Sequence, residues 1–171
     1  VKAVERRLGI AGALARRGLT GRAEAAFPAT VKKYPANPEA WLGYAKWYMA
    51  RNKPHRAEMI VRQGLEAIPA DARLHASIGG TFEHQGKLVN ALRAYRAASV
   101  LDPQNPVFED EVARLEFLQG DPLSAMNRWE KIVREHPGAE RAARRLALAY
   151  RSEEHTSELQ SQAYLVCRLL L

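Results

Sequence analysis

The side chains that most often carry out chemistry in proteins are thinly spread along this chain. None of its histidines is spaced from another histidine, a cysteine or an acidic residue as a metal site requires. The histidines are His55, His75, His84, His136 and His155. The single cysteine, Cys167, excludes an internal disulfide and a cysteine-based zinc site. We therefore expect no metal and no other cofactor.

The short motifs of common enzyme classes are also missing from the sequence. There is no nucleophile elbow, no phosphate-binding loop and no dinucleotide-binding glycine pattern. Glu109, Asp110 and Glu111 adjoin one another, but acidic residues are favoured in the first turn of a helix by its dipole. We interpret these three as a solvated helix turn, not as catalytic carboxylates, and predict that the chain is not an enzyme.

What the sequence does contain is a fixed period of 34 residues. Prolines, alanines and turn-forming residues each return at this interval. The sets are Pro35, Pro69, Pro103 and Pro137; Ala23, Ala57, Ala91 and Ala125; and Gly18, Asn52, Gly86 and Gly120. A period of this length predicts stacked helical units.

Two helices are predicted in each unit. Asn37-Pro38 and Asn105-Pro106 place a capping side chain before a proline at the first helical position. The recurring glycines would end the first helix, and the recurring prolines would end the second. We expect a repeat array over residues 1–150, with units at 4–37, 38–71, 72–105 and 106–139 and a partial unit at 140–150.

Small residues recur on the faces that these helices would pack together. Ala45 and Gly79 lie at the same position of successive first helices, and Ala57 and Ala91 at the same position of successive second helices. A large side chain there would overpack the contact at a cost of about 1–3 kcal/mol. We therefore predict close packing within each hairpin. Pro28 falls inside a predicted second helix and should kink it.

Two units carry a family pattern most fully, through Trp41, Tyr48, Ala57 and Pro69, and through Gly79, Phe82, Gly86, Ala91, Tyr95, Ala98 and Pro103. In these residues the chain resembles the tetratricopeptide repeat family. The resemblance implies an all-α solenoid of stacked helix–turn–helix repeats, wound as a right-handed superhelix. The third full unit departs from the pattern, because Glu116 stands where the others have Tyr48 and Phe82.

The resemblance also implies a non-catalytic scaffold that holds a peptide or partner helix in a concave groove. Each first helix has a second row of side chains that the core does not use. We expect these side chains to line the groove. The predicted groove residues are Leu42, Lys46, Met49, Arg73, Ser77, Glu83, His84, Asp110, Arg114, Phe117, Arg141 and Arg145. Arg141 and Arg145 match the last pair of the carboxylate clamp that some family members use for chaperone tails. Ala76, Gly80 and Glu111 replace the other clamp residues, so we do not expect that clamp here.

The formal net charge of +7 raises the question of a nucleic-acid partner. Basic residues are scattered among acidic ones, and only Arg141, Arg144 and Arg145 cluster tightly. We therefore expect a protein partner, of the kind recruited by a bacterial-type scaffold, and not nucleic acid. Two alternatives remain: a half-a-TPR-like RNA-processing scaffold, or the targeting arm of an enzyme whose catalytic domain lies elsewhere. No apolar run is long enough to span a bilayer.

The repeat register ends after Tyr150. Residues 151–161 read RSEEHTSELQS, a string similar to a translated sequencing-library adapter. We expect residues 151–171 to be a non-native tail; the alternative is a natural amphipathic capping helix. The chain begins at Val1, and we expect it to be a piece of a longer protein.

Overall fold

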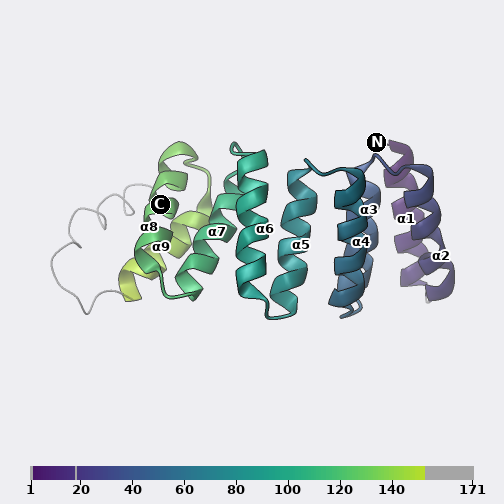
Figure 1. Cartoon of the computed structure of the whole chain (residues 1–171), viewed down its shortest axis with the longest axis horizontal. Coiled ribbons are helices and arrows are strands. Elements are labelled where there is room, and N and C mark those ends of the chain that lie inside the picture. The colour runs from purple at the N-terminus through teal and green to yellow at the C-terminus, as the bar shows by residue number, and fades with distance from the viewer. Residues whose placement is uncertain (1, 18, 153–171) are drawn as a thin grey trace. The chain divides into compact units, whose positions relative to one another are not determined.

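The computed structural model describes residues 2–17 and 19–152, which form nine α-helices and no strand (Figure 1). This is the all-α helical repeat solenoid that the 34-residue period predicts. The tail predicted to be non-native lies outside the described residues except for its first two positions, and Cys167 and Gly18 lie outside them too. The helices are α1 (Lys2–Arg16), α2 (Thr20–Lys33), α3 (Pro38–Met49), α4 (Pro54–Ala67), α5 (Ala72–His84), α6 (Leu88–Leu101), α7 (Pro106–Leu118), α8 (Pro122–Glu135) and α9 (Glu140–Ser152).

The helices belong to two compact units. The N-terminal unit is Val1–Leu101 and contains α1 to α6, and the C-terminal unit begins at Asp102 and contains α7 to α9. In the N-terminal unit, α1 packs on α2, α3 on α4 and α5 on α6. In the C-terminal unit, α8 packs on both α7 and α9.

Caps and turns hold the helix ends where the sequence predicts them. Asn37 Oδ1 accepts a hydrogen bond from the Glu39 amide at 3.0 Å, and Asn105 Oδ1 accepts one from the Val107 amide at 3.2 Å. Between the two helices of a unit, the backbone takes the left-handed conformation, with φ of 72° at Gly86 and 86° at Gly120. Glycine adopts this conformation without a steric penalty. The glycines therefore end the first helices, as the sequence predicts.

Small side chains bring the two helices of each hairpin together. Ala45, Ala57 and Ala91 are completely buried. At Gly79, an added Cβ would lie 3.0 Å from the ring of Tyr95, closer than such atoms normally approach. The predicted close packing is confirmed within the hairpins. Ala147 of α9 is only half-buried, because no described helix follows α9 to cover it.

Aromatic residues join α2 to α3 in the N-terminal unit. The rings of Phe27 and Tyr44 stack with centroids 5.4 Å apart, and the Tyr48 ring lies 5.1 Å from that of Tyr44. Burial raises the pKa of the Tyr44 hydroxyl above its ordinary value, and its hydrogen bond with Tyr48 acts in the same direction. The phenol therefore stays neutral in this core. Helix α2 continues across Pro28 without ending.

The buried alanines give a direct test of the hairpin packing. We expect Ala91→Arg to lower the free energy of unfolding by about 3–5 kcal/mol or more, because it buries an unpaired charge. Urea unfolding of the full chain, followed by circular dichroism, measures this change.

The matched control is Ala25→Arg, the same substitution at an exposed position of α2. It should change the free energy of unfolding by less than about 0.5 kcal/mol. Equal unfolding midpoints for the two variants would contradict the placement of Ala91.

Candidate functional site

Five of the twelve predicted groove residues meet on one side of the C-terminal unit. Asp110, Arg114 and Phe117 come from α7, and Arg141 and Arg145 come from α9. Helices α7 and α9 contact each other directly, and both pack against α8. We call the surface formed by these five residues and their neighbours on α7 and α9 the α7–α9 face.

Asp110 is the most heavily bonded residue of this face. The residue is 3% exposed. Its Oδ1 accepts a hydrogen bond from Trp129 Nε1 at 3.0 Å and lies 2.7 Å from Arg145 Nη1, while its Oδ2 lies 2.6 Å from Arg141 Nε. The prediction of a solvated turn is therefore wrong for Asp110. Its partners lie 19 to 35 residues further along the chain, so their proximity depends on how the helices stack.

Glu111 extends the same cluster towards solvent. Its Oε2 accepts from Arg114 Nε at 2.6 Å, and its Oε1 lies 3.1 Å from Arg141 Nη2. Three arginines predicted to contact a ligand are thus already paired with carboxylates of the chain itself. Arg141 nevertheless keeps 52% of its side chain exposed.

A second buried ion pair joins α7 to α8. Glu116 is 4% exposed and accepts from Arg128 Nε at 2.7 Å, and Glu109 accepts from Arg128 Nη1 at 2.8 Å. Burial alone would lower the pKa of Arg128, but the hydrogen bonds and charges of Glu116 and Glu109 outweigh it, so the pKa is raised. Arg128 and Trp129 were absent from the sequence-based site. The sequence held one signal that could have pointed to Arg128. Glu116 replaces a core aromatic residue, and Arg128 follows it by 12 positions.

The charges of α7 and α9 complement each other. Helix α7 carries four carboxylates and one arginine, whereas α9 carries four arginines and one glutamate. Opposite charges on neighbouring helices favour one register of packing and disfavour others. Ion pairs, together with apolar contacts, therefore position α9 against α7.

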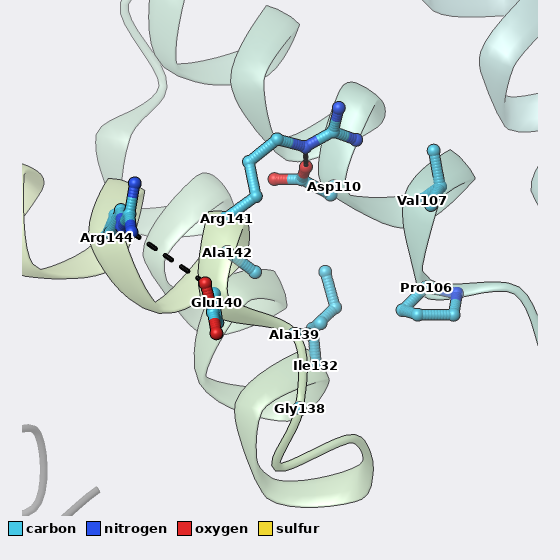
Figure 2. A pocket seen from close by; sticks show the side chains of 10 residues that line it. All are labelled: Pro106, Val107, Asp110, Ile132, Gly138, Ala139, Glu140, Arg141, Ala142 and Arg144. Carbon is cyan, nitrogen blue, oxygen red and sulfur yellow. Dashed lines mark hydrogen bonds and ion pairs between the residues drawn. The ribbon is translucent and has the colours of Figure 1, made fainter. Parts of the chain in front are cut away.

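Figure 2 shows a hollow on this face, which we call the N-terminal hollow because it lies at the first turns of α7 and α9. Its volume is about 520 Å³. Arg141 reaches across to Asp110 at its edge, and Arg144 pairs with Glu140 at 3.7 Å. It is lined by Pro106, Val107, Asp110, Ile132, Gly138, Ala139, Glu140, Arg141, Ala142 and Arg144.

The second hollow lies further along the same two helices and is mostly apolar; we call it the apolar hollow. Its volume is about 220 Å³. The Phe117 and Trp129 rings contact each other with centroids 5.8 Å apart, and Leu118 and Leu148 are 59% and 54% exposed. It is lined by Arg114, Phe117, Leu118, Trp129, Arg145, Leu148 and Ala149. Three predicted groove residues therefore meet around one apolar hollow.

The other seven predicted residues lie on α3 and α5 of the N-terminal unit, which contact each other. Among them, Arg73 pairs with Glu39 and with Asp71. Lys46 and His84 are also exposed, and the remaining four are half-buried: Leu42, Met49, Ser77 and Glu83. Their role in a groove stays a prediction.

His75 takes the place of Trp41 in the next repeat. Trp41 Nε1 donates to the Pro35 carbonyl at 2.8 Å, and His75 Nε2 lies 2.9 Å from the Pro69 carbonyl oxygen. The two contacts are one 34-residue period apart. In the part of the chain that the structure describes, no three potential metal ligands come together, and no helix is long and apolar enough to cross a bilayer.

Comparison with known proteins bears on the fold of the chain. Residues 14–78 match the family model described as tetratricopeptide repeat. Residues 14–78 therefore carry tetratricopeptide repeats. Repeats of this family form scaffolds for protein interaction, and this chain has that architecture. A search of curated proteins gave no match.

Several solved structures share the tetratricopeptide repeat fold. PilF of Pseudomonas aeruginosa is 19% identical over 99% of this chain and 73% of its own, with a TM-score of 0.76. TTC0263, a thermophilic TPR protein of Thermus thermophilus, is 18% identical over 85% and 80%, with a TM-score of 0.71. YrrB, described as a TPR protein with an unusual peptide-binding site, is 17% identical over 90% and 82%, with a TM-score of 0.65. At these identities the likeness shows the fold.

The buried cluster around Asp110 predicts a large effect on stability. Asp110→Ala should lower the free energy of unfolding by about 3–5 kcal/mol, because Arg145 and Trp129 lose their buried partner. Equilibrium urea unfolding measures the loss. Glu140→Ala is the control, since that side chain is 80% exposed and should contribute less than about 1 kcal/mol. Similar losses in both variants would show that Asp110 is not the centre of the cluster.

Proposed function

We propose that the α7–α9 face binds a segment of another protein and that the chain itself has no catalytic role. The observation that carries the proposal is the apolar hollow, whose rim leaves Leu118 and Leu148 more than half exposed. Exposed leucines beside a hollow floored by aromatic rings offer a partner an anchoring site. Such sites contribute most of the affinity in protein interfaces.

The size of the apolar hollow suits one large side chain. An apolar cavity of about 150 Å³ accommodates benzene, and this hollow measures about 220 Å³. Full burial of a leucine, methionine or phenylalanine side chain contributes about 1.5–3 kcal/mol. Phe117 and Trp129 supply the rigid apolar surface against which that side chain would pack. One such anchor supports a weak interaction, which further contacts along the face would strengthen.

The pairing of charges favours a protein over nucleic acid. Arg114, Arg141 and Arg145 are each within ion-pair distance of a carboxylate of α7. Binding to a phosphate backbone depends on releasing counterions from several cations, and here carboxylates already neutralise them. The same pairing argues against catalysis, because Asp110 and Glu116 are buried acceptors held by arginines.

The predicted residues of the N-terminal unit offer a second contact surface in this proposal. Leu42 and Met49 are half-buried apolar side chains on α3, and exposed Lys46 lies between them in the sequence. Arg73, Ser77, Glu83 and His84 follow on α5. An apolar contact with charged neighbours is the composition expected of a peptide-binding surface.

Random-peptide display on the full chain tests the proposal. We expect selected peptides to bind Leu148→Ser at least tenfold more weakly than the unmodified chain, because the substitution removes one wall of the apolar hollow. Fluorescence anisotropy of labelled peptides measures the affinity, and circular dichroism checks that helicity is unchanged.

Leu123→Ser is the matched control. Leu123 is 71% exposed on α8 and does not line the apolar hollow, so this variant should bind as the unmodified chain does. Failure to select any peptide, or equal binding by both variants, would contradict the proposal.

A further inference from the structure

The positive charge of the chain is concentrated in its first two helices. Residues 2–33, which form α1, α2 and the turn between them, contain eight basic and two acidic residues, a formal charge of +6. Residues 102–152 contain eight basic and nine acidic residues, a formal charge of −1. The first hairpin is therefore strongly cationic, whereas carboxylates balance the arginines of the C-terminal unit.

The cations of the first hairpin are exposed and unpaired. Within the described residues, seven of them are exposed and none lies within ion-pair distance of a carboxylate. Of the two acidic residues, Glu24 is engaged elsewhere, because Tyr48 donates to it at 3.1 Å and Arg56 of α4 lies 3.7 Å away. The surplus charge is thus available to a partner. The seven cations are Lys2, Arg6, Arg7, Arg17, Arg22, Lys32 and Lys33.

Three of these cations share one face of α1 with an aliphatic side chain. Val4 and Ala11 are each 1% exposed and lie on the buried side of the helix. The opposite side carries residues at successive spacings of four, four and seven, which bring side chains to one side of a helix. Ile10 is 52% exposed there. We call this side the α1 outer face; it consists of Lys2, Arg6, Ile10 and Arg17.

Arg6 departs from the pattern of the later repeats. A first helix packs against the second helix of the preceding unit, as α3 does on α2 and α9 on α8. At intervals of 34 residues after Arg6, the chain has apolar residues that are at most 6% exposed: Ala40, Leu74, Phe108 and Ala142. An arginine is unsuited to such a contact, because an unpaired buried charge is destabilising. The α1 outer face is therefore suited to water or to an anionic partner.

We propose that the α1 outer face binds the surface of a lipid bilayer that contains anionic headgroups. Lys2, Arg6 and Arg17 contact the headgroups, and Ile10 enters the boundary between the headgroups and the acyl chains. Binding of a helix to a bilayer surface increases with both its apolar contact and its attraction to anionic lipids. The cations of α2 add to this attraction over the range of the Debye length. This binding is independent of the function proposed for the α7–α9 face.

Three observations favour a bilayer over nucleic acid or an acidic peptide. Ile10 stands among the cations, where a phosphate backbone would offer it no apolar contact. The hairpin has no exposed aromatic ring on which a base could stack, since Phe27 is buried and Tyr34 is half-buried. The α1 outer face extends about 22 Å from Lys2 to Arg17, which suits a broad charged surface better than a single carboxylate.

The outer side of α2 would also allow a flat surface to approach. Between Arg22 and Lys32, the exposed residues of this helix are all small or compact. No bulky side chain would therefore hold a bilayer away from the cations. These residues are Ala25, Pro28 and Ala29.

Vesicle co-sedimentation of the full chain tests the proposal. One set of vesicles consists of phosphatidylcholine alone, and the other of two parts phosphatidylcholine and one part phosphatidylglycerol. We expect at least tenfold tighter binding to the anionic vesicles at low salt, because each cation near an anionic surface adds to the attraction. High salt should remove this difference, since it screens exposed charges.

Two double variants separate the α1 outer face from the overall charge. Arg6→Glu with Arg17→Glu should weaken binding to the anionic vesicles at least tenfold. The matched control is Arg93→Glu with Arg134→Glu, which changes the net charge equally at exposed positions of α6 and α8. It should retain most of the binding, because salt screens charges that lie beyond the Debye length.

A second matched pair tests the aliphatic contact. Ile10→Ser should weaken binding to the anionic vesicles at least threefold, because it removes the side chain that enters the bilayer. Val100→Ser should bind as the unmodified chain does, although Val100 is 79% exposed on α6. Circular dichroism checks that each variant keeps its helicity.

Several results would overturn the proposal. Equal binding to the two kinds of vesicle would do so, as would equal losses in the two double variants. Unchanged binding by Ile10→Ser would remove the reason for choosing a bilayer. Tighter binding of duplex RNA or of polyglutamate, with the same dependence on Arg6 and Arg17, would assign the face to nucleic acid or to an acidic protein. Peptide selection on the α7–α9 face is a separate test, and these results leave its outcome open.

Discussion

Close approach between the two helices of each hairpin is the constraint on which this structure depends. Completely buried alanines recur on the second helices at one position, and alanine or glycine recurs on the first helices. The tightest contact is at Gly79, which faces the ring of Tyr95. Because the contact recurs every 34 residues, the hairpins are built alike. The helix faces that this packing leaves uncovered form the surface that we propose for binding.

In the C-terminal unit, ion pairs supplement this packing and define the surface. The carboxylates of α7 lie between Arg128 of α8 and the arginines of α9. A buried carboxylate is costly unless it is fully paired, and Asp110 is paired with two arginines and a tryptophan. The cluster thereby holds α9 against α7. Residues that stabilise the unit also line both hollows, Asp110 and Arg141 the N-terminal hollow and Arg114 and Arg145 the apolar hollow.

The fold could be predicted from the sequence because its signals are local and repeated. Asn37, Asn105, Gly86 and Gly120 each act within a few residues of their own position, and the period made them recognisable. Asp110 could not be placed in this way. Its type and position resemble those of a solvated first-turn residue, and the partners that bury it come from α8 and α9. The proximity of Phe117 to Leu148 likewise depends on the stacking of two repeats, so the apolar hollow was predicted only in part, through Arg114, Phe117 and Arg145.

A double-mutant cycle at Gly79 and Tyr95 tests the packing constraint most directly. Replacing a helical glycine by alanine ordinarily stabilises a protein by about 0.5–1 kcal/mol. At this position the added methyl group would lie 3.0 Å from the Tyr95 ring. In urea unfolding of the full chain, Gly79→Ala should therefore lower the free energy of unfolding when Tyr95 is present and raise it in a Tyr95→Ala background. Stabilisation by the same amount in both backgrounds would contradict the account, because it would show that the helices leave room for a side chain.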